Sequence, residues 1–209
     1  MNIDRCFWTV GPGGAGQSLL THLIDNAFSG LHAFLDTNVY YDDHELRKQA
    51  ETLVHKLITT GQEAVENSKH GFREDLYKKH ISADPIAARL PYGIVTHLVS
   101  LYGWKRLELN KLIKFTGVTL PSVDSIHRRT WVVILKAKFL SPELVATIPN
   151  ASDQGIFCKD PKLKDVLKSA PAALALWQIL HGFMRKHTKD DSLQIIEDYA
   201  EVRGGQTDP

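Results

Sequence analysis

Residues 6–18 read CFWTVGPGGAGQS, an apolar run joined to a glycine-rich loop, and this stretch decides the fold class. An apolar strand that enters a tight glycine turn and then a helix directs several backbone N–H groups inward, which makes an anion cradle at the positive end of the helix. The phosphate-binding pattern is G-x-x-x-x-G-K-[ST], and seven of its eight places fit residues 11–18. Gln17 stands where the lysine belongs.

The loop residues carry the candidate nucleotide site. Glycines permit positive φ and close approach of a phosphate, and the Ser18 hydroxyl is a ligand type that Mg²⁺ accepts. Gln17 can hydrogen-bond a phosphate but cannot neutralise it. A glycine-rich turn that binds nothing is the alternative, but apolar residues recur at helical spacing over 19–27, as a strand, loop and helix unit requires. The candidate residues are Gly11, Pro12, Gly13, Gly14, Ala15, Gly16, Gln17 and Ser18.

Composition excludes several classes of protein. The 209 residues are 43% hydrophobic, enough for one core and a small appended subdomain. The 25 basic and 24 acidic residues nearly cancel, so no global basic field marks a nucleic-acid binder. Cys6 and Cys158 are too few for a disulfide framework. No apolar stretch approaches the roughly 20 residues of a membrane span, so we expect no membrane partner and a reducing cytoplasmic or nuclear location.

Hydrophobic periodicity predicts strands alternating with helices, followed by a helical end. We expect one or two strands in 31–41, an amphipathic helix over 45–59, partly helical structure in 62–80, and a second helical stretch over 84–102 kinked at Pro91. Residues 107–109 and 112–115 resemble strands, and 131–135 (WVVIL) is the strongest signal for a buried strand. Helices are expected over 163–167, 172–184 and 193–202.

These elements predict an α/β protein, a P-loop NTPase with a mainly parallel central sheet flanked by helices and a small C-terminal helical subdomain. The expected divisions are a nucleotide-binding core over 1–141, a helical subdomain over 142–203 and a frayed tail over 204–209.

Acidic residues ahead of the 45–59 segment are candidate ligands and catalysts. A nucleotide hydrolase needs carboxylates to hold Mg²⁺ and orient water at the end of a strand beside the phosphate loop. Asp42 and Asp43 are the candidate metal ligands with Ser18, and Glu45 is the candidate base. Asp36 is a rival ligand. The alternative is helix capping, in which such carboxylates stabilise the positive end of a helix without touching a metal.

Two further clusters carry basic residues. Thr116 precedes Arg128 and Arg129, and a positioned arginine, often supplied by a neighbouring subunit, can offset the charge of phosphoryl transfer. Paired arginines are also commonly just solvated. Trp104, Lys105 and Arg106, together with Lys111 and Lys114, interleave basic and aromatic residues as single-strand binding surfaces do, although scattered lysines on a sheet edge or turn give the same pattern.

Taken in order, these motifs resemble the superfamily 3 helicases, the ring-forming ATPases of DNA viruses, phages and plasmids, especially their poxvirus-type primase-helicase branch. GPGGAGQS resembles that family's GPGGxGKS loop, and Asp42, Asp43 and Glu45 resemble its metal-binding motif. Residues 56–63 are similar to the segment before its DNA-contacting hairpin, 111–129 to its sensor motif and arginine finger, and 157–182 to its following helical segment.

The resemblance implies an ATP-binding, Mg²⁺-dependent DNA helicase-like module of a viral or virus-derived replication protein. Its partner would be single-stranded or forked DNA, and a homo-oligomer would form only with an upstream domain that the family carries. Gln17 and Thr116 depart from the family's lysine and asparagine, which allows weakened hydrolysis. The alternatives are an inactive nucleotide-binding, nucleic-acid-binding or assembly module, and a small-molecule phosphotransferase.

Overall fold

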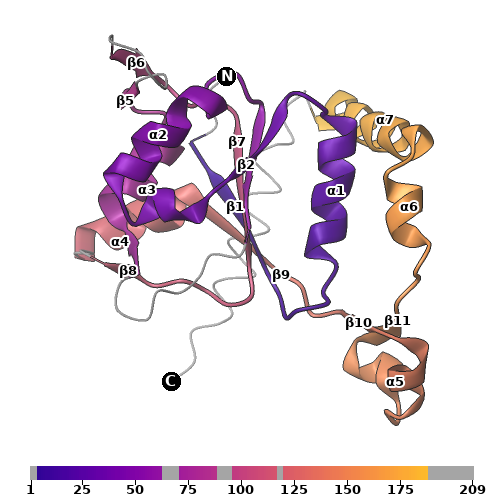
Figure 1. Cartoon of the computed structure of the whole chain (residues 1–209). Helices are drawn as coiled ribbons and strands as arrows, with labels where there is room; N and C mark the ends of the chain where they lie inside the picture. The colour runs from indigo at the N-terminus through magenta and orange to yellow at the C-terminus, as the bar shows by residue number, and fades with distance from the viewer. Residues whose placement is uncertain (1–3, 63–70, 89–95, 117–119, 188–209) are drawn as a thin grey trace.

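Five parallel strands form the central sheet of the computed structural model, which describes residues 4–62, 71–88, 96–116 and 120–187 (Figure 1). Every neighbouring pair in this sheet is parallel. The expected α/β class with a mainly parallel sheet is confirmed, and the arrangement is consistent with a P-loop-like fold. In spatial order the strands are β2 (His32–Leu35), β3 (Ile58–Gly61), β7 (Trp104–Leu109), β1 (Cys6–Val10) and β9 (Thr130–Ile134).

Helices flank both faces of this sheet (Figure 1). On one face lie α2 (Asp43–Leu53), α3 (Glu74–Ile81) and α4 (Leu120–Arg129), and on the other lie α1 (Gln17–Ala27), α6 (Leu163–Leu167) and α7 (Ala170–His187). The remaining elements are short: η1 (Thr37–Tyr40), α5 (Pro142–Ala146), η2 (Ala151–Gln154), and the strand pairs β4 (Phe72–Arg73) with β8 (Phe115–Thr116), β5 (Ile86–Ala88) with β6 (His97–Val99), and β10 (Lys138–Leu140) with β11 (Ile156–Cys158).

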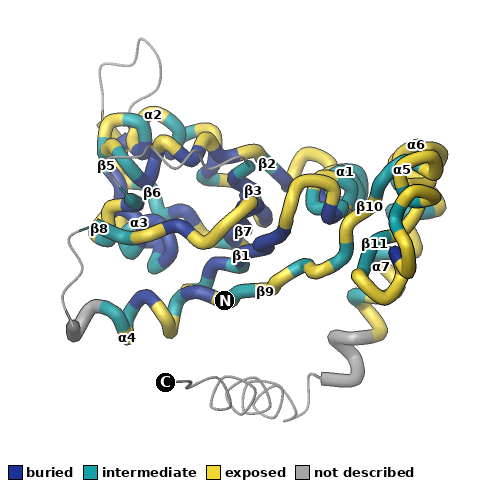
Figure 2. The backbone as a smooth tube through the Cα atoms, turned by 90° about the horizontal axis from the view of Figure 1, so that it is seen from below, coloured by how far each residue is buried: buried dark blue, intermediate teal, exposed yellow. Residues whose placement is uncertain are grey.

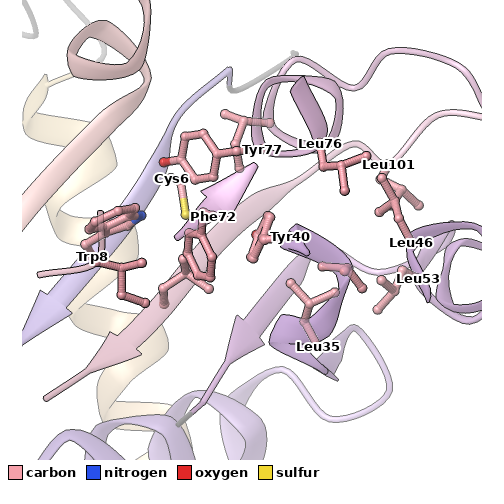
Figure 3. Packing of buried hydrophobic residues seen from close by; sticks show 14 of the residues in the cluster. Cys6, Trp8, Leu35, Tyr40, Leu46, Leu53, Phe72, Leu76, Tyr77 and Leu101 are labelled. Carbon is pink, nitrogen blue, oxygen red and sulfur yellow. The ribbon is translucent and has the colours of Figure 1, made fainter. Parts of the chain in front are cut away.

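The hydrophobic core lies between the sheet and the helices α2 and α3, which cover one of its faces (Figure 3). Alternate residues of a strand share a face, so Cys6 and Trp8 of β1 both point into this core. Aromatic rings fill its centre: Trp8 meets Tyr77 edge-on at a centroid distance of 5.9 Å, and Tyr40 lies 4.6 Å from Phe72. Such large buried rings dominate core energetics, so this face anchors the sheet.

The C-terminal elements are much less buried than the sheet (Figure 2). Neither α5 nor α6 contains a buried residue. This part of the chain is attached to the end of α1, where Asn26 Nδ2 donates to the carbonyls of Leu167 (3.1 Å) and Ser169 (2.9 Å). Trp177 Nε1 donates to the carbonyl of Ala27 at 2.8 Å. These hydrogen bonds, together with the packing of Trp177 against Phe28, attach the C-terminal elements to the end of α1.

The expected helix over 45–59 is wrong at its end. α2 stops at Leu53, and Ile58–Gly61 instead forms the fully buried strand β3 between β2 and β7. Leu57 and Ile58 lie at helical spacing from the apolar residues of α2, so they prolonged the helical stripe in the sequence. The β-branched side chains of Ile58, Thr59 and Thr60 favour the extended conformation.

The expectation of one or two strands in 31–41 is confirmed by a single strand, β2. It is followed by η1, because Asp36 accepts a hydrogen bond from the N–H of Asn38 at 2.9 Å and starts a helical turn. The expected helix over 84–102 is wrong where the chain is described, since β5 and β6 pair there as antiparallel strands. Pro91 lies outside the described residues.

Burial along two strands also differs from expectation. The WVVIL segment forms β9, but β9 is an edge strand whose Val133 and Ile134 are exposed. Conversely, Lys105 and Arg106 lie on neither a basic surface nor a sheet edge, because they belong to β7 in the middle of the sheet and are 1% and 8% exposed. In this sheet the apolar run WVVIL therefore lies on an edge strand, and the charged pair Lys105 and Arg106 lies on a central strand.

The helices at the C-terminal end agree well with expectation. α6 occupies 163–167 as predicted, and α7 contains the predicted 172–184. α3 confirms partial helicity in 62–80 for its described part. The predicted helix over 193–202 and the tail over 204–209 lie outside the described residues.

A buried histidine should make the fold sensitive to mild acid. His80 is fully buried, its Nδ1 lies 2.9 Å from the Tyr40 hydroxyl, and burial together with the charge of Lys105 lowers its pKa to about 3. In the unfolded chain the pKa is about 6.5, so below that pH the unfolded state binds the extra proton. We expect the free energy of unfolding to fall by up to about 1.4 kcal/mol per pH unit below pH 6.5.

The measurement is urea unfolding of the wild type and of His80→Met between pH 6.5 and 5. This window lies above the titration of Asp43 and Asp75, whose pKa values are lowered by their basic partners despite the opposing effect of burial. The wild type should lose stability more steeply than His80→Met. Parallel pH profiles would contradict this assignment.

Candidate functional site

A cleft of about 400 Å³ opens at the carboxyl ends of the parallel strands. In open α/β sheets this edge is where ligands bind, because the loops that follow neighbouring strands converge there. The loop after β1 provides one wall, and single residues that follow β3 and β7 provide another. The described lining residues are Gly13, Gly14, Ala15, Gly16, Gln17, Ser18, Leu19, Gln62, Glu108, Asn110, Phe139 and Lys159.

The glycine loop adopts a conformation that other residues rarely tolerate. Gly14 has φ 89° and Gly16 has φ 85°, both in the left-handed region. A Cβ on Gly14 would also lie 3.2 Å from the carbonyl oxygen of Phe139. Gly16 is the N-cap of α1, which has no side-chain cap and no acidic residue in its first turn. The first amides of a helix lack intrahelical partners, so an anion in the cleft can satisfy them.

Gln17 directs its amide nitrogen toward the sheet. Nε2 donates to the carbonyls of Thr9 at 2.8 Å and Leu109 at 3.0 Å, at the carboxyl ends of β1 and β7. The N–H of Gly11 donates to the same Leu109 carbonyl at 3.0 Å. Gln17 therefore fastens the loop to the two strands beneath it, and both amide hydrogens have protein acceptors.

A buried polar network lies under the loop. Arg106 Nη2 and Glu108 Oε1 form an ion pair at 3.0 Å, and the Thr21 hydroxyl of α1 contacts both side chains. Arg106 Nε donates to Thr9 Oγ1 at 3.1 Å, and Gln62 Nε2 donates to Glu108 Oε2 at 2.8 Å. Burial lowers the pKa of Arg106, and Glu108 opposes this shift. The network joins α1, β1, β7 and the end of β3 at the floor of the cleft.

The structure places the predicted acidic residues at helix starts. Asp42 caps α2 by accepting from the N–H of His44 at 2.8 Å, which is the contact that the capping alternative predicts, and Asp36 makes the same kind of contact at the start of η1. Burial alone would raise the pKa of Asp43, but Lys79 at 3.3 Å and Arg47 at 2.5 Å lower it. Glu45 pairs with Lys48 at 3.4 Å. None of these carboxylates is among the described residues lining the cleft.

Thr116, Arg128 and Arg129 also lie apart from the described lining of the cleft. Thr116 belongs to β8, and its hydroxyl lies 3.4 Å from the carbonyl oxygens of Gly71 and Phe72. Arg129 donates to the Ser82 hydroxyl at 2.9 Å and to the Ser125 carbonyl at 3.1 Å, whereas Arg128 is exposed on the last turn of α4. The predicted roles of these residues stay predictions.

Sequence reasoning missed six residues that line the cleft: Leu19, Gln62, Glu108, Asn110, Phe139 and Lys159. A signal for two of them was present, because Gln62 and Asn110 are the first residues after β3 and β7. Polar residues directly after parallel strands meet at the ligand-binding edge. Phe139 and Lys159 carried no comparable signal, since they reach the cleft from the distant β10 and β11 segment.

The described residues do not form a preassembled metal centre. Across 4–62, 71–88, 96–116 and 120–187, no three His, Cys, Asp or Glu side chains gather as a metal site would require. Magnesium does not need such a cage, because it is commonly held by one or two protein oxygens and by substrate phosphates. In the same described ranges, no helix is both long and apolar enough to cross a membrane.

This geometry defines an α/β protein with a mainly parallel sheet, consistent with a P-loop-like fold, and a cleft at the carboxyl edge of that sheet. The same fold occurs in solved structures of the NrS-1 C-terminal region. An apo structure of residues 305–718 gives a TM-score of 0.54 at 14% identity over 83% of this chain and 36% of that chain. A second apo structure, the A form, gives 0.52 at 13% identity over 80% and 34%.

The chain thus spans about a third of the NrS-1 chains that it matches. At this level of identity the likeness concerns the fold alone. No protein-family model and no curated protein sequence matches the chain.

The ion pair under the loop gives a stability prediction. Glu108→Leu leaves the Arg106 guanidinium buried without its partner, and breaking a buried pair costs about 3–5 kcal/mol. Replacing both residues, as Arg106→Met with Glu108→Leu, removes the uncompensated charge and should cost less than Glu108→Leu alone. Urea unfolding of the wild type, both single variants and the double variant measures the coupling. Additive losses would show that the two side chains do not depend on each other.

Proposed function

We propose that the cleft binds ATP with Mg²⁺ and that the chain is a superfamily 3 helicase-like module of a viral or virus-derived DNA replication protein. The observation that carries this proposal is the glycine loop, which opens α1 with two left-handed glycines and leaves the first turn uncapped. Backbone amides in this arrangement suit a phosphate chain. The cleft volume of about 400 Å³ lies within the range of small-molecule sites, about 300–1,000 Å³.

Different residues of the chain would bind the phosphates, hold the metal ion and orient water. Loop residues 13–18 would hold the phosphates through backbone amides, and the Ser18 hydroxyl would be a ligand of Mg²⁺, which neutralises phosphate charge when bound. Asn110 lines the cleft just beyond β7, where it would orient water or a phosphate oxygen. Asp42, Asp43 and Glu45 have no part in this proposal because their carboxylates are outside the described lining.

A second candidate is a module that binds nucleotide without turnover. It is favoured by Gln17, which brings no positive charge and whose Nε2 already has two carbonyl acceptors. A charge-assisted hydrogen bond contributes about 1.5–3 kcal/mol, so the missing lysine weakens the hold on a transferring phosphate. Glu108 is also engaged by Arg106, Thr21 and Gln62, which leaves it poorly suited to act as a base.

DNA binding and ring assembly would belong to a larger protein. The resemblance of the ordered motifs to superfamily 3 helicases supports a single-stranded or forked DNA partner. Arg128 is the better candidate for a contact with a neighbouring subunit's nucleotide, because it is exposed whereas Arg129 is bonded within the chain.

Nucleotide binding should be visible as thermal stabilisation. A ligand at a hundred times its Kd stabilises the folded state by about 2.7 kcal/mol, which for a chain of this size raises Tm by about 5 °C or more. Differential scanning fluorimetry with ATP, with and without Mg²⁺, measures the shift. Ser18→Ala is expected to lose most of the Mg²⁺-dependent part. Absence of any ATP-induced shift in both the wild type and Gln17→Lys would rule out the nucleotide site.

Gln17→Lys separates the two candidate functions. Restoring the cation should raise ATP hydrolysis about tenfold or more, because about 1.4 kcal/mol of transition-state stabilisation gives a factor of ten. Phosphate release with and without single-stranded DNA measures turnover, and Gln17→Met is the matched control that removes the amide without adding charge. ATP binding without turnover in Gln17→Lys would favour the non-hydrolysing module.

A further inference from the structure

The cleft contains a lysine that does not come from the glycine loop. Among the described lining residues, Lys159 is the only cation and Glu108 is the only carboxylate. Glu108 is already paired with Arg106 at 3.0 Å. The Lys159 side chain is exposed, and its ammonium has no hydrogen-bond acceptor among the residues that the structure describes. Its charge is therefore available to a ligand in the cleft.

Backbone hydrogen bonds fix the position of the Lys159 main chain relative to the glycine loop. The N–H of Phe139 in β10 donates to the carbonyl of Gly14 in the loop at 2.9 Å. One residue further, the carbonyl of Leu140 accepts from the N–H of Lys159 at 2.7 Å, directly after β11. β10 and β11 also pair in parallel, with Leu140 opposite Cys158. Two backbone contacts thus connect the Lys159 main chain to the glycine loop.

We propose that Lys159 supplies the positive charge that Gln17 lacks and contacts the phosphate chain of a nucleotide held by the glycine loop. This inference rests on the proposed nucleotide site and adds a binding residue to it. A lysine ammonium binds phosphate as a point charge and needs no fixed planar geometry. It can therefore act from a different element than the loop, because Lys159 lines the same cleft.

The arrangement also explains how the loop tolerates Gln17. The amide of Gln17 holds the loop against Thr9 and Leu109, a structural task, while the cation approaches from β11. Structural fastening and charge compensation are then carried by two residues. In the usual phosphate-loop pattern a lysine occupies the position of Gln17, directly after the last glycine, and supplies the charge from the loop itself.

The test is isothermal titration calorimetry, which measures the Kd of the 209-residue chain for Mg²⁺·ATP and for inorganic triphosphate. Inorganic triphosphate has no base or sugar. Lys159→Ala should weaken binding of both ligands about tenfold or more, and Lys159→Arg should retain most of the affinity because it keeps the charge. Lys162→Ala is the matched control: Lys162 is also exposed, three positions further along, and is not among the lining residues. Melting temperatures without ligand should be alike in all variants.

The combination of Lys159→Ala with Gln17→Lys provides a second readout. Restoring a cation in the loop should recover most of the affinity that Lys159→Ala loses. Equal affinities of the wild type and Lys159→Ala for ATP would overturn this inference and leave the nucleotide site intact. Equal losses in Lys159→Ala and Lys162→Ala would overturn it in favour of general surface charge. No binding by the wild type would instead overturn the proposed function itself.

Discussion

Parallel pairing of β1 with both β7 and β9 is the constraint on which the cleft depends. In this register Val10 lies opposite Leu109 on one side and Ile134 on the other, so three strands end together. The glycine loop leaves from the middle strand of the three. Its neighbours then supply the carbonyl of Leu109, which accepts from Gly11 and Gln17, and the polar side chain of Asn110. A slip of one residue would reverse every side chain on β1 and remove this alignment.

The two faces of the sheet are buried by different kinds of contact. One face buries aromatic and aliphatic side chains against α2 and α3, which provides the non-directional part of the stability. The other face places Arg106, Glu108 and Thr9 under α1, where burial is tolerable only because the groups bond to one another. This network of directional contacts lies at the floor of the cleft, next to the candidate site.

The sequence predicted the local features of this protein well. CFWTV followed by a glycine loop and a helical stripe was sufficient for β1, the loop and α1, because each signal lies within a few residues. It failed where burial on both sides of a strand decides the outcome. The first two residues of β3, Ile58 and Thr59, were assigned to the end of a helix because Ile58 continues the apolar spacing of the preceding helical stripe. Lys105 and Arg106 were assigned to a surface or edge because their burial depends on contacts distant in sequence. Thr9 of β1, which accepts from Arg106 Nε, becomes its neighbour only when β1 and β7 pair.

The two anchored ends of α1 have a consequence for the order of folding. Phe139 meets the loop at the start of this helix, and Asn26 and Ala27 at its end are bonded to residues 141 to 150 positions further along the chain. Contacts at such separation form only after much of the chain has been ordered, because long loops must close first. During synthesis the glycine motif emerges early, yet Phe139 and Lys159, which complete the lining of the cleft, emerge much later. The cleft is therefore a late product of folding, although its most recognisable residues come first.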